Sequence, residues 1–139
     1  MFRFSIKLTV KEADVNDRQH VSFDRYFVFF NEARIAYLAM LGYYFDAGPR
    51  SGVIAINAHC AYRKELRLGD EITVGCKIRE IKKKSFVMEF VISMKDHPCA
   101  EGDAAFLYFD YENRNVTAFP PQFIEDVQSH EGLIEPPVM

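Results

Sequence analysis

The stretch that decides the fold is Phe23–Tyr44, FDRYFVFFNEARIAYLAMLGYY, the longest apolar run of the chain. It contains no proline, and its single glycine, Gly42, stands where a helix would end. Ser22 or Asp24 can cap the start of such a helix, because short polar side chains accept hydrogen bonds from the first free N–H groups. The pattern therefore predicts one helix over about residues 23–43, roughly 30 Å long at about 1.5 Å per residue.

This predicted helix has almost no polar face. After Tyr26 its only strongly polar side chains are Asn31, Glu32 and Arg34. A helix that is apolar nearly all round is buried on most sides. We therefore expect the rest of the chain to wrap around it.

Five segments have the composition and patterning of strands. They cover residues 2–10, 53–64, 72–78, 86–94 and 104–111. Turns are expected at Leu68–Asp70, at Lys82–Ser85 and at His97–Gly102. The order of strand, long helix and four further strands predicts an α+β fold, with a curled antiparallel sheet of about five strands wrapped around one long central helix.

The ends of this pattern define one domain. A loop containing Gly48-Pro49 is expected at residues 46–52, and a short helix at Gln122–Gln128 after Pro120-Pro121. We expect a single domain over residues 1–128 and a loose C-terminal tail over residues 129–139, which contains Pro136-Pro137.

Composition narrows the functional classes. The chain has 139 residues and a net charge of −3, whereas proteins that bind nucleic acid through phosphates carry a basic excess. No apolar stretch is long enough to span a bilayer and the N-terminus has no signal-peptide pattern, so we expect a cytoplasmic protein. Cys60, Cys76 and Cys99 lie apart in apolar segments, which is typical of core thiols and not of a metal site. We expect no metal and no cofactor.

Several motifs resemble those of the 4-hydroxybenzoyl-CoA thioesterase family. Within Gln19–Arg34, QHVSFDRYFVFFNEAR, the matching residues are His20-Val21, Tyr26, Phe30 and Glu32-Ala33-Arg34. Tyr62-Arg63 with Leu68-Gly69-Asp70 is similar to the family's second strand and turn, and Lys84-Ser85-Phe86 is similar to its basic hairpin tip. The resemblance implies a hotdog fold, a dimer whose two sheets join edge to edge, and hydrolysis of an acyl-CoA thioester. We expect a homodimer or a homotetramer made of two dimers, because pairing would cover the edge strands and the rest of the apolar helix.

Such a reaction needs two kinds of group. Hydrogen-bond donors must face the oxygen that becomes negative, and free N–H groups at the start of the long helix, near Ser22–Asp24, can supply them. A carboxylate must act as nucleophile or as general base for water. The family places this Asp four residues before His20, where the present chain has Asn16.

Three carboxylates could replace the missing one. Asp17 is adjacent to Asn16, Asp14 lies two residues before it, and Glu32 lies on the helix. Asn16 itself could orient water or donate to the carbonyl. The structural alternatives remain open, since Asp is common in turns and Glu32 could be a paired residue at a dimer contact.

The remaining candidate residues would bind substrate. His20, Ser22, Phe23, Asp24 and Tyr26 surround the expected start of the helix. The basic turn of Lys82, Lys83, Lys84 and Ser85, with help from Arg63 and Arg79, could contact the phosphates of coenzyme A, or it could be a solvated hairpin tip. Fatty and aromatic acyl groups both fit the apolar segments, and acyl carrier protein could replace coenzyme A.

Two other functions stay open beside hydrolysis. A domain of this fold that binds acyl-CoA without hydrolysing it is favoured by Asn16, because an amide is neither a base nor a good nucleophile at neutral pH. A dehydratase of the same fold is disfavoured, since its catalytic His and acidic partner occur in motifs that this sequence lacks.

Overall fold

The computed structural model describes residues 2–45 and 50–133 and contains one antiparallel sheet. Its long strands are β1 (Phe4–Thr9), β2 (Ser51–Tyr62), β3 (Glu71–Ile81), β4 (Ser85–Met94) and β5 (His97–Asp110). They lie in the order β1-β3-β4-β5-β2, and the two-residue strand β6 (Asn115–Val116) pairs with β5. This confirms a predominantly antiparallel sheet with one helix inserted after the first strand. All five predicted strands are present.

Helix α1 (Arg25–Met40) is shorter than predicted by about two residues at its start and three at its end. Asp24 occupies the N-cap position, but its side chain makes no capping hydrogen bond. At the other end Gly42 takes a positive φ of 95°, which lets the chain turn away while the Tyr43 N–H bonds to the carbonyl of Leu38. A glycine at this position therefore ends the helix before the apolar run ends.

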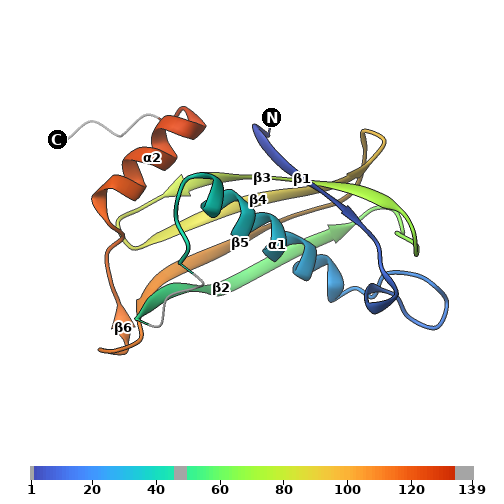
Figure 1. The fold of residues 1–139 in the computed structure, drawn as a ribbon, viewed down its shortest axis with the longest axis horizontal. Helices are drawn as coiled ribbons and strands as arrows, with labels where there is room; N and C mark the ends of the chain where they lie inside the picture. The colour runs from blue at the N-terminus through green and yellow to red at the C-terminus, as the bar shows by residue number, and fades with distance from the viewer. Residues whose placement is uncertain (1, 46–49, 134–139) are drawn as a thin grey trace.

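One face of α1 packs on the sheet, and none of the described residues covers the opposite face (Figure 1). The prediction that the helix is buried on most sides is wrong for the single chain. Phe30, on the buried face, stacks on Phe90 of β4 with ring centroids 4.6 Å apart. Ile35 and Met40, on the other face, are 41% and 43% exposed, beside the exposed Asn31 and Glu32.

Close approach of α1 to the sheet depends on Gly102 of β5. A Cβ atom at this position would lie 2.6 Å from the ring of Phe30 and 2.3 Å from the carbonyl oxygen of His59. Any larger residue would therefore push the helix away from the sheet.

The turn predicted at His97–Gly102 is wrong, because these residues form the first part of β5. The chain reverses instead at Lys95 and Asp96, which both have positive φ values, of 51° and 66°. Two consecutive residues in this conformation make a tight hairpin, in which His97 pairs directly with Met94.

The C-terminal helix α2 (Pro121–Glu131) is longer than the predicted Gln122–Gln128 and crosses the domain limit expected at residue 128. It ends at Gly132, which has a φ of 68°, and packs beyond the C-terminal end of α1 (Figure 1). Residues 46–49 of the predicted loop and residues 134–139 of the predicted tail lie outside the described residues.

The three cysteines are free thiols in this structure. Cys76 and Cys99 are buried and Cys60 is half-buried, in agreement with the prediction of core residues. Burial raises the pKa of all three thiols above the ordinary value, so they remain protonated and unreactive at neutral pH.

Candidate functional site

The candidate site lies in the segment between β1 and α1, residues 10–24, which we call the α1 loop. Its two halves form a short hairpin, with Val15 paired to Val21 and the N–H of Ser22 bonded to the carbonyl of Asp14. A second contact, from the N–H of Val21 to the carbonyl of Leu66, anchors the hairpin on the segment after β2. The loop is therefore held in place right up to the start of α1.

Asp14 is an internal support of this loop. Its side chain is 1% exposed, and its Oδ1 accepts hydrogen bonds from Nε and Nη2 of Arg25 at 3.1 and 2.6 Å. Its Oδ2 accepts from the N–H of Lys11 at 2.9 Å. Both carboxylate oxygens are thus occupied, which favours a structural role over a catalytic one.

Asn16 organises the tip of the hairpin. Its side-chain oxygen accepts hydrogen bonds from the N–H groups of Arg18 and His20 at 3.0 and 3.2 Å. Gln19, with a φ of 67°, completes the tight reversal and donates to the carbonyl of Asn16. An amide oxygen in this arrangement shapes the loop, while the NH2 group of Asn16 donates to no acceptor among the described residues.

Asp17 differs from Asp14 in every respect that matters for catalysis. It is exposed at the tip of the hairpin and pairs with no other residue in the described ranges 2–45 and 50–133. Its carboxylate is therefore available to bind water or a substrate. Of the four predicted catalytic positions, Asp17 and Glu32 are the two whose carboxylates pair with no described residue.

His20 ties the hairpin to the segment after β2. Its Nδ1 lies 3.1 Å from Oε2 of Glu65, and its backbone forms a bridge with Arg67. These contacts support the predicted place of His20 beside the loop and give it a structural function there.

The start of α1 carries two of the donors predicted near Ser22–Asp24, but the N–H of Ser22 is bonded to the carbonyl of Asp14. In the described part of the chain, the main-chain N–H groups of Phe23 and Asp24 donate to no acceptor. Both residues are exposed, with Phe23 at 73%. Unpaired N–H groups at the positive end of a helix dipole are suited to bind a carbonyl oxygen that becomes negative.

Aromatic residues flank these donors. Tyr26 is 4% exposed and packs edge-on against Tyr62 of β2, with ring centroids 4.8 Å apart. The hydroxyl of Tyr62 donates to the carbonyl of Phe23 at 2.9 Å. Burial raises the pKa of both tyrosines, so both hydroxyls keep their protons at neutral pH. The contact of Tyr62 was missed from the sequence, because 39 residues separate it from Phe23.

Glu32 lies on the exposed side of α1, away from the free N–H groups. It lines a hollow of about 240 Å³ between β1 and α1, together with Asp14 and Arg25. Eight residues separate it from Asp24, which is about 12 Å along a helix. The structure therefore does not bring Glu32 of one chain to the start of α1.

The predicted phosphate-binding residues also lie elsewhere. Lys82, Lys83 and Lys84 form the β3–β4 turn, at the opposite end of the sheet from the α1 loop (Figure 1). The eleven residues of β3 span about 33 Å between these ends. Ser85 opens β4, where its carbonyl accepts from the N–H of Lys82 at 2.8 Å. Arg63 forms an ion pair with Glu101, with Nη2 and Oε2 2.6 Å apart.

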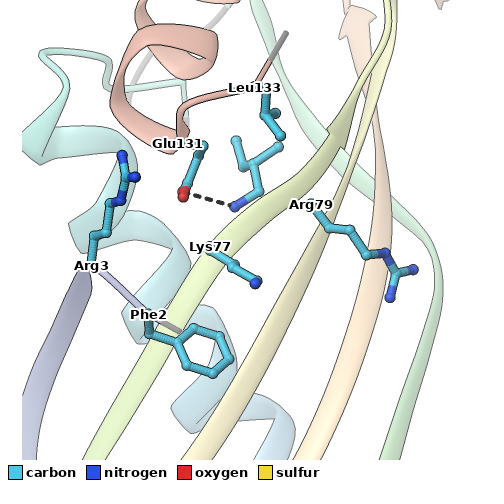
Figure 2. Close-up of a pocket in the computed structure, with 7 residues that line it drawn as sticks. Phe2, Arg3, Lys77, Arg79, Glu131 and Leu133 are labelled. Carbon is cyan, nitrogen blue, oxygen red and sulfur yellow. Dashed lines mark hydrogen bonds between the residues drawn. The ribbon is translucent and has the colours of Figure 1, made fainter.

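A separate hollow of about 670 Å³ lies between the N-terminal strand, β3 and α2. Figure 2 shows Glu131 accepting a hydrogen bond from the N–H of Ile78, while the side chains of Arg3 and Arg79 point away from one another. The Glu131 carboxylate also accepts from the hydroxyl of Tyr37. Because the cations do not converge and the carboxylate is already bonded, the hollow is not built as an anion-binding site. The contacts of Glu131 hold α2 to the sheet.

No group of three or more His, Cys, Asp or Glu side chains in residues 2–45 and 50–133 is arranged to hold a metal ion. Neither helix of that part of the chain is long and apolar enough to cross a membrane.

The chain is similar to a family of thioesterases and to a protein named as an esterase. The model of the Thioesterase-like superfamily matches residues 10–127. A protein of Aquifex aeolicus (strain VF5) named "Putative esterase" is 24% identical over 126 residues, which cover 89% of this chain and 95% of that protein.

Solved structures share the fold. A 1,4-dihydroxy-2-naphthoyl-CoA thioesterase from Synechocystis superposes with a TM-score of 0.82 at 15% identity, covering 92% of this chain and 97% of that one. A Staphylococcus aureus protein in complex with CoA has a TM-score of 0.84 at 18% identity, covering 98% of this chain and 87% of that one. At these identities the likeness establishes the fold alone.

Proposed function

Because the chain belongs to the thioesterase-like superfamily, we propose that it hydrolyses an acyl-CoA thioester, or the matching acyl-carrier-protein thioester, to a free acid and a thiol. The observation that carries this proposal is the pair of unpaired, exposed N–H groups of Phe23 and Asp24 at the start of α1. A site built this way stabilises the negative oxygen formed when water attacks a thioester carbonyl.

The base in this proposal is Asp17. Its carboxylate accepts a proton from water, the resulting hydroxide attacks the carbonyl carbon, and the C–S bond breaks to release a thiolate that takes up a proton. The free carboxylate of Asp17 supports this assignment, whereas that of Asp14 is bonded to Arg25 and Lys11. The free NH2 group of Asn16 would orient the water or the carbonyl.

The proposed assembly is a homodimer formed through β2. This strand is an edge of the sheet, and its exposed side chains include the 53% exposed Ile56, at a bulge in its pairing with β5. Antiparallel pairing of β2 with its copy would cover this edge and the exposed face of α1 with Ile35 and Met40. Sedimentation at micromolar concentration should give twice the mass of one chain, or four times for a dimer of dimers, and a stable monomer would contradict it.

The dimer also gives the basic turn a role. In a two-fold pair with antiparallel α1 helices, Lys82–Lys84 of one subunit lie at the same end of the assembly as the α1 loop of the other. Coenzyme A could then span from the free N–H groups of one subunit to the lysines of its partner. The same arrangement would bring Glu32 onto the contact between the two helices.

The function is tested by thiol release from a panel of acyl-CoAs with fatty and aromatic acyl groups. Steady turnover that is lost in Asp17→Asn, with an unchanged melting temperature, is the expected result. No thiol release from any member of the panel would contradict hydrolysis.

A second candidate is an acyl-CoA-binding module without hydrolytic activity. It is favoured by Asn16, which stands where the family has a carboxylate. The side-chain oxygen of Asn16 accepts hydrogen bonds from the main chain of the loop. Calorimetry on the same panel separates the two functions, because binding without thiol release supports the module and steady turnover excludes it.

A further inference from the structure

We propose that Tyr62 is a positioning residue for the hydrolytic site, because it fixes the peptide group that presents the Asp24 N–H to the substrate carbonyl. The proposal rests on the proposed function and adds to it a residue from β2, outside the α1 loop. Its basis is the hydrogen bond from the Tyr62 hydroxyl to the carbonyl of Phe23, 2.9 Å long.

The carbonyl of Phe23 and the N–H of Asp24 belong to one peptide group. In a planar trans peptide these two groups point in opposite directions. A hydroxyl that holds the carbonyl on one side therefore fixes the direction of the N–H on the other side. Donation to the carbonyl also polarises the peptide, which makes its N–H a stronger donor.

Nothing else in the described residues fixes this peptide in the same way. The Asp24 side chain makes no capping bond, and the Asp24 N–H has no acceptor. The first turn of α1 is bonded around it, from the N–H of Arg25 to Ser22 and from the N–H of Phe27 to Asp24. The Phe23–Asp24 peptide thus depends on Tyr62 for its orientation.

The ring of Tyr62 is itself held firmly enough for this purpose. It packs edge-on against the buried Tyr26, at an interplanar angle of 87°. Its main chain is paired with Ala100 of β5, so the residue belongs to the sheet and not to the loop that it supports. The hydroxyl therefore links the rigid part of the molecule to the donors of the site.

Tyr62→Phe is the informative variant, since it removes the hydroxyl and keeps the ring on Tyr26. We expect kcat to fall about five- to tenfold with KM unchanged, which is the size of one lost hydrogen bond that acts in the transition state. The matched control is Tyr43→Phe, which removes a hydroxyl bonded to Asp126 at the other end of α1 and should leave kcat unchanged.

A second readout does not depend on turnover. The ¹H and ¹⁵N frequencies of the Asp24 amide should move in Tyr62→Phe by more than those of its neighbours, and they should not move in Tyr43→Phe. Unchanged Asp24 amide frequencies in Tyr62→Phe would overturn the proposal. So would an unchanged kcat in Tyr62→Phe, provided that the wild type hydrolyses acyl-CoA. If the wild type released no thiol, hydrolysis would be refuted, and the Asp24 frequency alone would decide whether Tyr62 orients the peptide.

Discussion

Within the described residues, the N-terminal end of α1 leaves the N–H groups of Phe23 and Asp24 without acceptors, whereas the C-terminal end is closed by hydrogen bonds. At the closed end, the N–H groups of Leu41, Gly42 and Tyr43 all bond to carbonyls of the last helical turns.

Tyrosines brace both ends of the helix. Tyr43 donates to Asp126 of α2 at the closed end, and Tyr62 donates to a main-chain carbonyl at the open end. Both ends of α1 therefore carry hydrogen-bonded polar residues, so the presence of polar residues alone does not identify a functional site in this molecule. What distinguishes the open end is main-chain donors that have no acceptor among the described residues. The unpaired carboxylate of Asp17 lies at the tip of the loop that leads into this end.

The largest effect is expected from the carboxylate at the tip of the α1 loop. Asp17→Asn should lower kcat by about two orders of magnitude or more, because general-base catalysis contributes that much. Asn16→Asp should keep or increase activity, since it returns a carboxylate to the position that the family uses. Thiol-release kinetics measure both variants.

The outcome of the same assay can move the role to another residue. Loss of activity only in Asp14→Asn, or only in Glu32→Gln with an intact dimer, would contradict the assignment to Asp17. Retained activity in all three single variants would show that none of these carboxylates is the base and would contradict the proposed mechanism. Acyl-CoA binding without thiol release by the wild type would leave binding as the function.

A stability effect separates Asp14 from Asp17 within the same loop. Asp14→Asn should lower the free energy of unfolding by about 1–3 kcal/mol, because it weakens a buried acceptor of Arg25, whose own side chain is partly exposed. Asp17→Asn is the control and should leave stability unchanged. Urea unfolding of the two variants checks this, and equal stability would contradict the structural role of Asp14.

At the closed end, Tyr43→Phe should reduce stability by about 1 kcal/mol at pH 8. Burial, followed by the hydrogen bond to Asp126, raises the pKa of Tyr43 from 10.0 to about 12. Because the folded pKa is the higher one, the neutral Tyr43 hydroxyl stabilises the fold fully below pH 10.0, the pKa of tyrosine in the unfolded chain. This contribution is lost as the pH rises through the folded pKa of about 12. The difference between wild type and variant should therefore shrink at pH 11, and a constant difference would contradict this cause.

The smallest effect tests whether the β3–β4 turn of one subunit contributes to substrate binding at the start of α1 of its partner. Replacing Lys82, Lys83 and Lys84 by Ala should raise KM about threefold with little change in kcat, and added salt should weaken substrate binding to the wild type. A matched control replaces Lys7, Lys64 and Lys95, which line a hollow near the α1 loop and change the net charge equally. A raised KM only in the control would place the phosphates there.

Sequence patterns predicted what depends on short-range periodicity. The alternation in β3 and β4 located both strands, and Gly42 located the end of α1. The β4–β5 turn was missed because Lys95 and Asp96 adopt positive φ without a glycine to signal it.

The candidate site was only partly predictable for a different reason. The free donors follow from the geometry of any helix start, and their position was predicted. The burial of Asp14 depends on Arg25, eleven residues away, and the support of Phe23 depends on Tyr62 in another element. Such contacts are set by the packing of the sheet against the α1 loop, which no local pattern encodes. The exposed face of α1 was predicted to be buried in the single chain. Apolar residues in a sequence do not reveal whether the same chain or a partner covers them.

The most direct test of the central claim is to locate the substrate carbonyl. A ketone analogue of acyl-CoA, with a methylene group in place of the thioester sulfur, binds without being hydrolysed and can be titrated into ¹⁵N-labelled protein. We expect the amide resonances of Phe23 and Asp24 to shift most in the proton dimension, as they gain an acceptor. Saturable binding that leaves both amides unmoved while residues elsewhere shift would contradict a thioester site at the start of α1.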